Sequence, residues 1–567
     1  MVNGSATKGL LVLATFAAAA IVAVQGAAGA TTRLDPYGTT LLDGRKVFPI
    51  VLAKGPERGA TTPTGADGLD EVVGAGVNFF KVGPATIPWT SADVNDAHAW
   101  NREAGERGAY TWINMATLSK APESSQLRAV VTALKGGDRA DAIGMWKGAD
   151  EPRWVGTTPG ELQYAYCLAT SHGEEKGWCA GELPADSDHL WVTIQAPRGT
   201  AAQLAPYSAV TDIHGVDDYP VTWADRLDPK LHDVGRWTDT IASITPNHAV
   251  WTTLQVCASG SDNDQGEFVL PTPLQERYMI YDAIINGARN LAFYGGNINR
   301  CWTEQDTELQ WNWTFWDSVL GDLIREINAV SPLAPALVNP ETTQVLTSSD
   351  PSTQVIARRG ATSEDIWVIA ARSGADSQPV TISGLPGGVS TGTAYTEGRT
   401  VAVTGGSFTD TFERWGVHVY HFRDEPPPAP PPPPAPPPPP APPPPPAPTP
   451  PPPPPPPPNE PPATTTKPAS RLASAGVSVS RARAGQLFSV RVSVVTETGS
   501  PVRAGVVRCT ARVGRATLRP VFKGWKRGRA TCTWRLPKTS RGKSLQTRIR
   551  VQSRGSTLTR SLARRVS

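Results

Sequence analysis

Short apolar runs alternate with longer amphipathic stretches along the first 330 residues of the chain. The runs are rich in valine, isoleucine and aromatic residues, which is typical of buried strands. The stretches between them carry apolar residues at helical spacing, and this alternation predicts a parallel sheet with crossover helices. The predicted strands cover residues 47–52, 77–82, 110–115, 143–146, 190–195, 212–216, 249–255 and 290–294.

The amphipathic stretches predict one helix after each strand. They cover residues 69–74, 91–107, 124–134, 159–176, 200–204, 233–244, 273–286 and 311–330. Eight such units in about 290 residues match an α/β fold of the (β/α)8 TIM-barrel type better than an open doubly wound sheet. We therefore predict a barrel over residues 31–333. No glycine-rich phosphate loop follows a predicted strand, which argues against a nucleotide-binding enzyme.

The pattern changes after residue 333 to short alternating strands separated by glycine and proline turns. This change predicts a small antiparallel β-sandwich over residues 334–425. Because no linker separates it from the last helix, we expect the sandwich to dock on the barrel. Its strands are predicted at residues 354–358, 366–371, 380–382 and 416–422.

Residues 426–462 are almost all proline, with a few alanines. Such a sequence adopts polyproline II geometry, so we predict a disordered but semi-rigid linker that spans roughly 100 Å. Alternating strands return beyond it and predict an immunoglobulin-like β domain over residues 463–567. Its strands are predicted at residues 487–495, 505–513, 530–536 and 547–553.

The N-terminus has the features of a signal peptide. Lys8 precedes an apolar run over residues 9–24, and Ala28-Gly29-Ala30 offers a cleavage site, so we predict a signal peptide over residues 1–30 and secretion. A retained N-terminal anchor is the alternative. The six cysteines fit an oxidising compartment. We predict the pairs Cys167–Cys179, Cys257–Cys301 and Cys509–Cys532, and we expect neither a metal site nor a cofactor.

The net charge of +3 hides two parts of opposite sign. From residue 463 onwards the chain holds 24 Lys and Arg against the single acid Glu497, and the remainder holds 30 basic and 50 acidic residues. The basic domain predicts an anionic partner, such as an acidic polymer of the cell envelope, an anionic lipid or an acidic polysaccharide. Secretion argues against nucleic acid. The alternative is a β domain with scattered surface arginines. Nothing in the sequence indicates an oligomeric state.

Candidate chemistry begins at the end of the fourth predicted strand, at Asp150-Glu151-Pro152. A TIM barrel carries its catalytic side chains at the carboxyl ends of its strands. Hydrolysis of a glycosidic bond needs one carboxyl group as a proton donor and a second as nucleophile or base. Glu151 is therefore a candidate acid. The alternative is a turn that caps the next helix.

The sixth and seventh strands end in further candidates. Asp217-Asp218-Tyr219-Pro220 follows the sixth strand and supplies two more carboxylates, with a capped turn as the alternative. The seventh ends in Gln255, which cannot be a nucleophile, and its loop holds Asp262, Asp264 and Glu267.

Aromatic residues lie just past several strand ends, where a ring can stack on a pyranose face. They are Trp89, Trp154, Tyr219, Trp223 and Trp302, and ordinary packing is the alternative for each. We predict that substrate contacts come from Asp150, Tyr219, Trp223, Gln255, Tyr294 and Trp302. His214, inside the sixth strand, is expected to be a core histidine.

Seven segments occur in barrel order and together resemble bacterial glycoside hydrolases of the large retaining barrel clan, near the family 42 β-galactosidase-like group. The resemblance covers about residues 43–330 and rests on the order of the segments. They are Phe48-Pro49-Ile50, Gly76-Val77-Asn78, Asp150-Glu151-Pro152, Gly215-Val216-Asp217-Asp218-Tyr219-Pro220, Trp251-Thr252-Thr253-Leu254-Gln255, Pro271-Thr272-Pro273 and Ala283-Ile284-Ile285-Asn286-Gly287-Ala288-Arg289.

The resemblance implies a carbohydrate-acting barrel in which Glu151 is the proton donor. In that clan the donor commonly stands in Asn-Glu-Pro, and here Asp150 replaces the asparagine. The nucleophile is a glutamate that ends the seventh strand, where this chain has Gln255 or a close neighbour. Three interpretations follow. A glycoside hydrolase can take its second carboxylate from Asp217, Asp218 or the loop acids; the barrel can bind glycan without chemistry; or it can be a structural module of the cell surface.

Overall fold

The computed structural model describes residues 30–424 and 472–566, apart from short internal stretches. These stretches are residues 85–88, 121–122, 171–183, 223–224, 226–227, 246–248, 259–267, 340–341, 481, 497–500, 503–505, 515, 527–528 and 554–555. The predicted signal peptide before Ala30 and the proline-rich linker lie outside the described residues. The chain divides into two units, residues 1–431 and 432–567, and each is described by itself.

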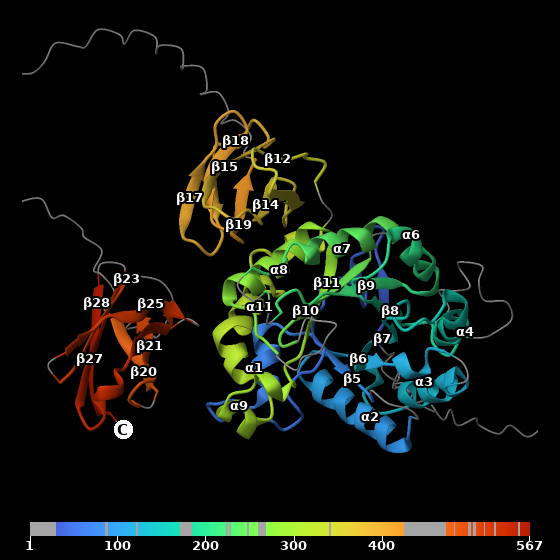
Figure 1. Ribbon diagram of the computed structural model, residues 1–567, viewed down its shortest axis with the longest axis horizontal. Helices are drawn as coiled ribbons and strands as arrows, with labels where there is room; N and C mark the ends of the chain where they lie inside the picture. The colour runs from blue at the N-terminus through green and yellow to red at the C-terminus, as the bar shows by residue number, and fades with distance from the viewer. Residues whose placement is uncertain are drawn as a thin grey trace, which may run out of the picture. The chain divides into compact units, whose positions relative to one another are not determined.

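Eight parallel strands in the first unit close a barrel, which confirms the predicted fold (Figure 1). They follow one another around the ring in chain order, and the last strand pairs with the first. Each lies where the apolar pattern places it. The strands are β4 (Ile50–Leu52), β5 (Phe79–Val82), β6 (Tyr110–Asn114), β7 (Ile143–Asp150), β8 (Leu190–Gln195), β9 (Ile213–Asp217), β10 (Val250–Gln255) and β11 (Ala288–Tyr294).

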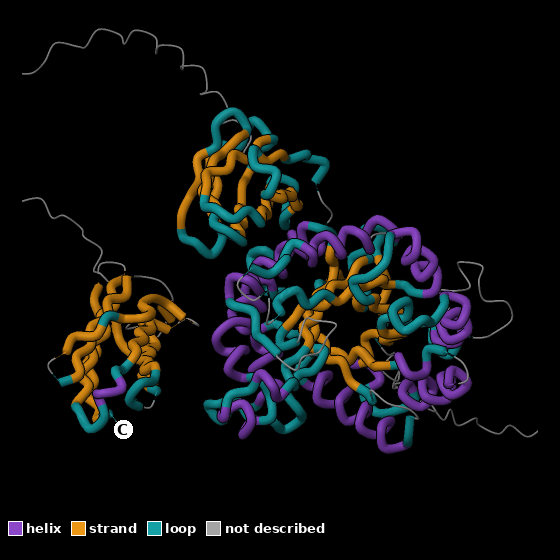
Figure 2. The backbone as a smooth tube through the Cα atoms, in the orientation of Figure 1, coloured by secondary structure: helices purple, strands orange, loops and turns teal. Residues whose placement is uncertain are grey.

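Helices surround the barrel strands, as the ring of helix around strand in Figure 2 shows. Several begin at a threonine whose hydroxyl accepts a hydrogen bond from a backbone N–H of the first turn; Thr90, Thr158 and Thr272 are examples. The helices are α1 (Gly68–Ala75), α2 (Ser91–Glu106), α3 (Leu127–Lys135), α4 (Pro159–Ala169), α6 (Ala201–Leu204), α7 (Asp233–Ile244), α8 (Pro273–Ile285), α9 (Glu304–Leu309), α10 (Trp313–Phe315), α11 (Gly321–Ile327) and α12 (Ala334–Val338). Among the described residues, none of the helices combines the length and the apolar character that a bilayer span requires.

A small sheet packs against the amino-terminal ends of the barrel strands. It consists of β1 (Thr32–Leu34), β2 (Thr40–Leu42) and β3 (Arg45–Val47). The Thr32 hydroxyl donates a hydrogen bond to the carbonyl of Gly144 at the start of β7, and Leu42 joins the apolar core inside the barrel. The opposite end, where the strands terminate, remains the mouth.

Two antiparallel sheets follow the barrel and enclose their own core. One holds β12 (Thr347–Ser348), β15 (Gln378–Ser383) and β18 (Ser407–Phe412); the other holds β13 (Thr353–Arg359), β14 (Asp365–Arg372), β16 (Thr391–Ala394), β17 (Arg399–Ala402) and β19 (Val417–Arg423). The sandwich contacts α8 of the barrel, where the Arg277 guanidinium donates a hydrogen bond of 2.6 Å to the Val417 carbonyl.

The second unit is also a pair of antiparallel sheets. One is ordered β20 (Leu472–Val479), β21 (Leu487–Thr496), β26 (Arg529–Arg535), β25 (Pro520–Lys526), with β22 (Pro501–Val502) beside β21. The other is ordered β24 (Ala516–Leu518), β23 (Val506–Val513), β27 (Ser544–Ser553), β28 (Ser556–Arg565). The disulfide Cys509–Cys532 joins the two sheets, and Cys257–Cys301 joins the loops after β10 and β11. Both pairs were predicted; the third involves Cys179, outside the described residues.

Candidate active site

A bulge in β7 turns two charged side chains into the barrel mouth. Lys147 lies opposite Val192 of β8, whereas Asp150 lies opposite Ile194, so three steps on β7 match two steps on β8. In a regular strand residues three apart point to opposite faces, and the bulge cancels this alternation. The Lys147 ammonium therefore reaches the Asp150 carboxylate at 2.6 Å. Lys147 is 2% exposed and Asp150 is 55% exposed, so the pair runs from the barrel interior to the solvent.

Glu151 follows this pair in a conformation that few residues other than glycine adopt. Its φ is 45°, and its N–H donates a hydrogen bond of 2.7 Å to the Ile194 carbonyl at the end of β8. A left-handed backbone at such a residue costs on the order of 1–3 kcal/mol and persists where the surroundings hold it in place. The conformation keeps the half-buried Glu151 side chain beside Asp150.

A second lysine enters the mouth from β5. Lys81 pairs in register with Trp112, whose indole stacks on that of Trp251 at 4.5 Å between ring centroids. The Lys147 ammonium lies over the same Trp112 ring, 5.9 Å from its centroid. The two indoles thus belong to the apolar layer on which the polar mouth rests. Burial lowers the pKa of Lys81 to about 8, and the nearby Lys147 acts in the same direction. Within the described part of the chain, Lys81 makes no hydrogen bond or ion pair.

The last strand position of β9 adds a third carboxyl group. Asp217 accepts a hydrogen bond of 3.1 Å from the Tyr219 hydroxyl, and the Tyr219 ring stacks on Tyr294 at 5.7 Å. Burial raises the pKa of Asp217 well above its usual range, and the carboxylates of Glu151 and Asp150 raise it further. Like charges held this close share a proton more readily than they both ionise.

The three carboxyl groups consequently differ in protonation. Burial, and then the Asp150 charge, raise the pKa of Glu151. Burial alone would also raise the pKa of Asp150, but the ammonium groups of Lys147 and Lys81 outweigh it and hold that pKa below its usual range. The Asp150 carboxyl group therefore favours its ionised form, whereas Glu151 and Asp217 keep their protons to higher pH than ordinary carboxyl groups do. Opposite shifts of this kind separate an acid from a base.

Aromatic residues line part of the rim. Trp154 is 53% exposed, and the Arg198 guanidinium lies 3.7 Å from its ring centroid. The positive charge of Arg198 also lowers the pKa of Glu151, so the Trp154–Arg198 pair lies near the carboxyl groups of the mouth. Trp89 is buried against Gly83, and the Trp302 indole donates to the Gly296 carbonyl. Of the predicted rim indoles that the structure describes, Trp154 is the most exposed to solvent.

Other predicted site residues lie elsewhere or have different partners. Gln255 is fully buried, and its amide exchanges hydrogen bonds with the backbone N–H and carbonyl of Val221. Asp218 points away from the mouth toward α7 and α8, where burial and the Asp233 charge raise its pKa to about 7. His214 is buried against Ser208, as expected of a core histidine. The prediction for Trp223, like those for Asp262, Asp264 and Glu267, concerns residues outside the described part of the chain.

Two residues of the mouth, Lys81 and Lys147, were not predicted from the sequence. Each stands inside an otherwise apolar strand, in Phe79-Phe80-Lys81-Val82 and in Met145-Trp146-Lys147-Gly148. Strands of a parallel barrel are buried on both faces, and a lysine is almost never buried without a partner. A lysine inside an apolar barrel strand therefore indicates a polar site in the barrel, and this feature of the sequence could have predicted both residues. The described residues hold no group of three or more His, Cys, Asp and Glu side chains arranged to bind a metal ion.

No protein-family model and no curated protein matches the chain. Solved structures similar to it include an α-amylase from Geobacillus thermoleovorans complexed with acarbose, at 12% identity and a TM-score of 0.43, covering 67% of this chain and 99% of that one. A family 27 β-L-arabinopyranosidase from Geobacillus stearothermophilus, in complex with arabinose, has 10% identity, a TM-score of 0.43, and coverages of 69% and 99%. A family 30 endoxylanase from Clostridium papyrosolvens has 12% identity, a TM-score of 0.38, and coverages of 70% and 100%. The narrower resemblance to the family 42 group stays a prediction.

Proposed function

We propose that the barrel is a secreted glycoside hydrolase whose catalytic carboxyl groups are Asp150, Glu151 and Asp217. One arrangement supports the proposal: Asp150 accepts a hydrogen bond of 2.6 Å from the Lys147 ammonium, which favours its ionised form, and it shares the mouth with Glu151 and Asp217, whose pKa values are raised by burial. Hydrolysis of a glycosidic bond requires this division between a protonated and an ionised carboxyl group. The predicted resemblance to glycosidases points to the same reaction.

In this proposal each group has a defined task. The proton held by Glu151 and Asp217 passes to the glycosidic oxygen as the bond to the leaving sugar breaks. Asp150, kept ionised by Lys147, faces the positive charge that develops at the anomeric carbon and takes a proton from the water molecule that attacks this carbon, so that the water supplies the hydroxyl group of the released sugar. Tyr219 orients Asp217, and the Trp154 indole offers a face for a sugar ring at the rim. Asp150 thus moves from a predicted substrate contact to a catalytic group.

Substitution of the three carboxyl groups tests the assignment. Asp217→Asn and Glu151→Gln each remove one of the two carboxyl groups that can hold the donated proton, and we expect each to lower kcat by about 10²–10⁴-fold on an aryl or oligosaccharide substrate found by screening. Asp150→Asn should lower kcat at least as much, because its amide cannot carry the negative charge. Thermal unfolding must be measured alongside, since the buried Lys147 would lose its partner.

Asp218→Asn is the matched control. It changes the neighbouring carboxyl group of the same strand end, which points away from the mouth, so its kcat should stay within about threefold of the wild type. Equal losses for Asp217→Asn and Asp218→Asn would overturn the assignment. Wild-type turnover in Asp150→Asn would do the same.

One observation favours a second candidate reaction. Lys81 has a lowered pKa of about 8 and no hydrogen-bond partner within the described residues, and a lysine of this kind can form a Schiff base with a carbonyl substrate. Such a protein would be a lyase rather than a hydrolase. Borohydride reduction in the presence of carbonyl compounds distinguishes the two, because it would attach the substrate to Lys81 and inactivate only the lyase.

A further inference from the structure

Several arginines lie on one outer face of the second unit. In the sheet of β23, β27 and β28, alternate residues such as Val513, Leu545 and Ile549 point into the core. The residues between them point outward. They include Arg508 and Arg512 on β23, Arg548 and Arg550 on β27, and Arg565 at the end of β28, all exposed. We call Arg508, Arg512, Arg548 and Arg550 the arginine face.

The strand register brings these like charges together. Arg508 lies directly opposite Arg550, and Arg548 lies between Thr510 of β23 and Ser561 of β28. Directly opposed like charges destabilise a sheet, so this arrangement opposes folding rather than supporting it. The sequence from residue 463 onwards contains a single acidic side chain, Glu497, which lies outside the described residues. Among those described in this unit, the arginine face therefore has no carboxylate partner.

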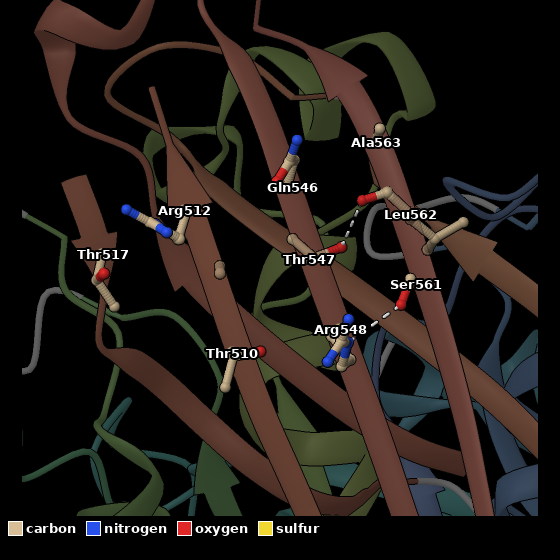
Figure 3. A pocket seen from close by; sticks show the side chains of 10 residues that line it. Thr510, Arg512, Thr517, Gln546, Thr547, Arg548, Ser561, Leu562 and Ala563 are labelled. Carbon is tan, nitrogen blue, oxygen red and sulfur yellow. Dashed lines mark hydrogen bonds between the residues drawn. The ribbon is translucent and has the colours of Figure 1, made fainter. Parts of the chain in front are cut away.

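A groove of about 650 Å³ crosses the same face (Figure 3). Arg512 and Arg548 stand along it, and between and beside them lie hydroxyl and amide side chains. These are Thr510, Thr517, Gln546 and Ser561. The Nε–H of Arg548 donates a hydrogen bond of 3.3 Å to the Ser561 hydroxyl, and the terminal N–H groups of Arg548 make no hydrogen bond with the described residues. Cationic and neutral hydrogen-bonding groups alternate across the surface.

We infer that the arginine face binds an acidic polysaccharide that carries a carboxylate on its repeating sugars. The planar guanidinium matches a carboxylate with two parallel hydrogen bonds, and 19 of the 24 basic residues in this segment are arginine. The hydroxyl and amide groups of the groove suit sugar hydroxyls. Residues two apart on a strand lie about 6.8 Å apart and neighbouring strands about 4.8 Å apart, so the face presents a grid of charges that fits a polymer.

The lining argues against single-stranded nucleic acid as the occupant. Proteins that bind single strands stack the bases on aromatic side chains. The residues that line the groove include no aromatic ring. A nucleic acid could satisfy the guanidinium groups through its phosphates, but its bases would find no platform here.

A binding assay with the full-length chain tests the inference. Immobilised polygalacturonate serves as the probe, and neutral dextran measures non-specific retention. The triple variant Arg508→Gln, Arg512→Gln and Arg548→Gln should bind at least tenfold more weakly than the wild type. The matched control changes three exposed arginines on the outward side of the other sheet, Arg491, Arg529 and Arg535, to Gln and should bind within about twofold of the wild type.

Salt and competition complete the test. Wild-type affinity should fall linearly on a log–log plot against salt, and more steeply than that of the face variant, because fewer charge contacts remain in the variant. If the triple variant does not fold, Arg548→Gln alone should weaken binding about threefold or more. Equal weakening in both triple variants would overturn the inference, because the attraction would then be a diffuse effect of net charge. Displacement by single-stranded DNA or polyphosphate at tenfold lower concentration than by soluble polygalacturonate would also overturn it.

Discussion

Lys81 is a lysine of the mouth that has no carboxylate partner among the described residues. An ammonium group inside a barrel is usually held by a carboxylate, as Lys147 is held by Asp150. Lys81 acts on Asp150 and Asp217 only through its field. Its charge lowers the pKa of Asp150, so it helps to keep that group ionised. Its own pKa of about 8 means that this help weakens in alkaline solution.

Lys81→Met should therefore change the pH dependence of hydrolysis. The pKa of Asp150 rises when the positive charge is removed, so the acidic limb of the kcat/KM profile should move to higher pH. The sign follows because a nearby cation favours the ionised form of a carboxyl group. Lys81→Arg keeps the charge and should restore the wild-type limb. A profile for Lys81→Met that is lower at every pH but unmoved would contradict this electrostatic role.

The bulge in β7 is the element on which the site depends. It places Lys147 and Asp150 on the same face of the strand, and Gly148 within it leaves no room for a side chain. A Cβ atom at Gly148 would lie 2.1 Å from the indole nitrogen of Trp191 on the neighbouring strand. The strand must shift to admit even one methyl group.

Gly148→Ala should lower the stability of the protein by about 1–3 kcal/mol, a usual penalty for overpacking a core. Activity should fall further than stability explains, because the Asp150 carboxylate moves with the strand. Gly160→Ala is the control: it lies in the first turn of α4, where a Cβ atom meets nothing closer than 4.0 Å. Thermal unfolding and kcat measured on both variants check the expectation. Full activity in Gly148→Ala would show that the bulge is not needed.

The elements were more predictable than the site. All eight barrel strands follow from apolar runs because a parallel strand is buried on both faces and its sequence reports that burial. The register between neighbouring strands cannot be predicted from the local sequence in the same way. The bulge at Gly148 and the left-handed Glu151 arise from pairing with β8, which no local pattern encodes, so Asp150 was expected to contact substrate rather than to pair with Lys147. Likewise, Asp217 and Asp218 are adjacent carboxylates in the sequence, and only the strand's alternation separates the one that faces the mouth.

At the scale of the whole molecule, the chain joins parts of opposite charge. Residues 1–462 carry 30 basic and 50 acidic side chains, whereas the rest carries 24 basic residues and one acid. A surface of one sign repels ligands of the same sign and attracts those of the other. This asymmetry supports the two proposals made above, that the barrel hydrolyses a glycoside and that the arginine-rich unit binds an anionic polymer.

Removal of residues 463–567 separates these tasks. On a soluble glycoside, kcat and KM should stay within about twofold of the full-length values, since the carboxyl groups of the mouth all belong to the barrel. Retention on polygalacturonate beads should be lost, and with it any rate advantage on glycan attached to those beads. A loss of activity on the soluble substrate would show that the second unit takes part in the reaction itself.

The opposed arginines of β23 and β27 have one more consequence. Their mutual repulsion raises the free energy of the empty sheet, and a polyanion that neutralises them lowers it again. Binding of a polyanion, as inferred above, should therefore stabilise this unit, so that bound molecules unfold and are degraded more slowly than free ones. Selective survival of the bound molecules would concentrate the protein where such a polymer is abundant, without any signal beyond the polymer itself.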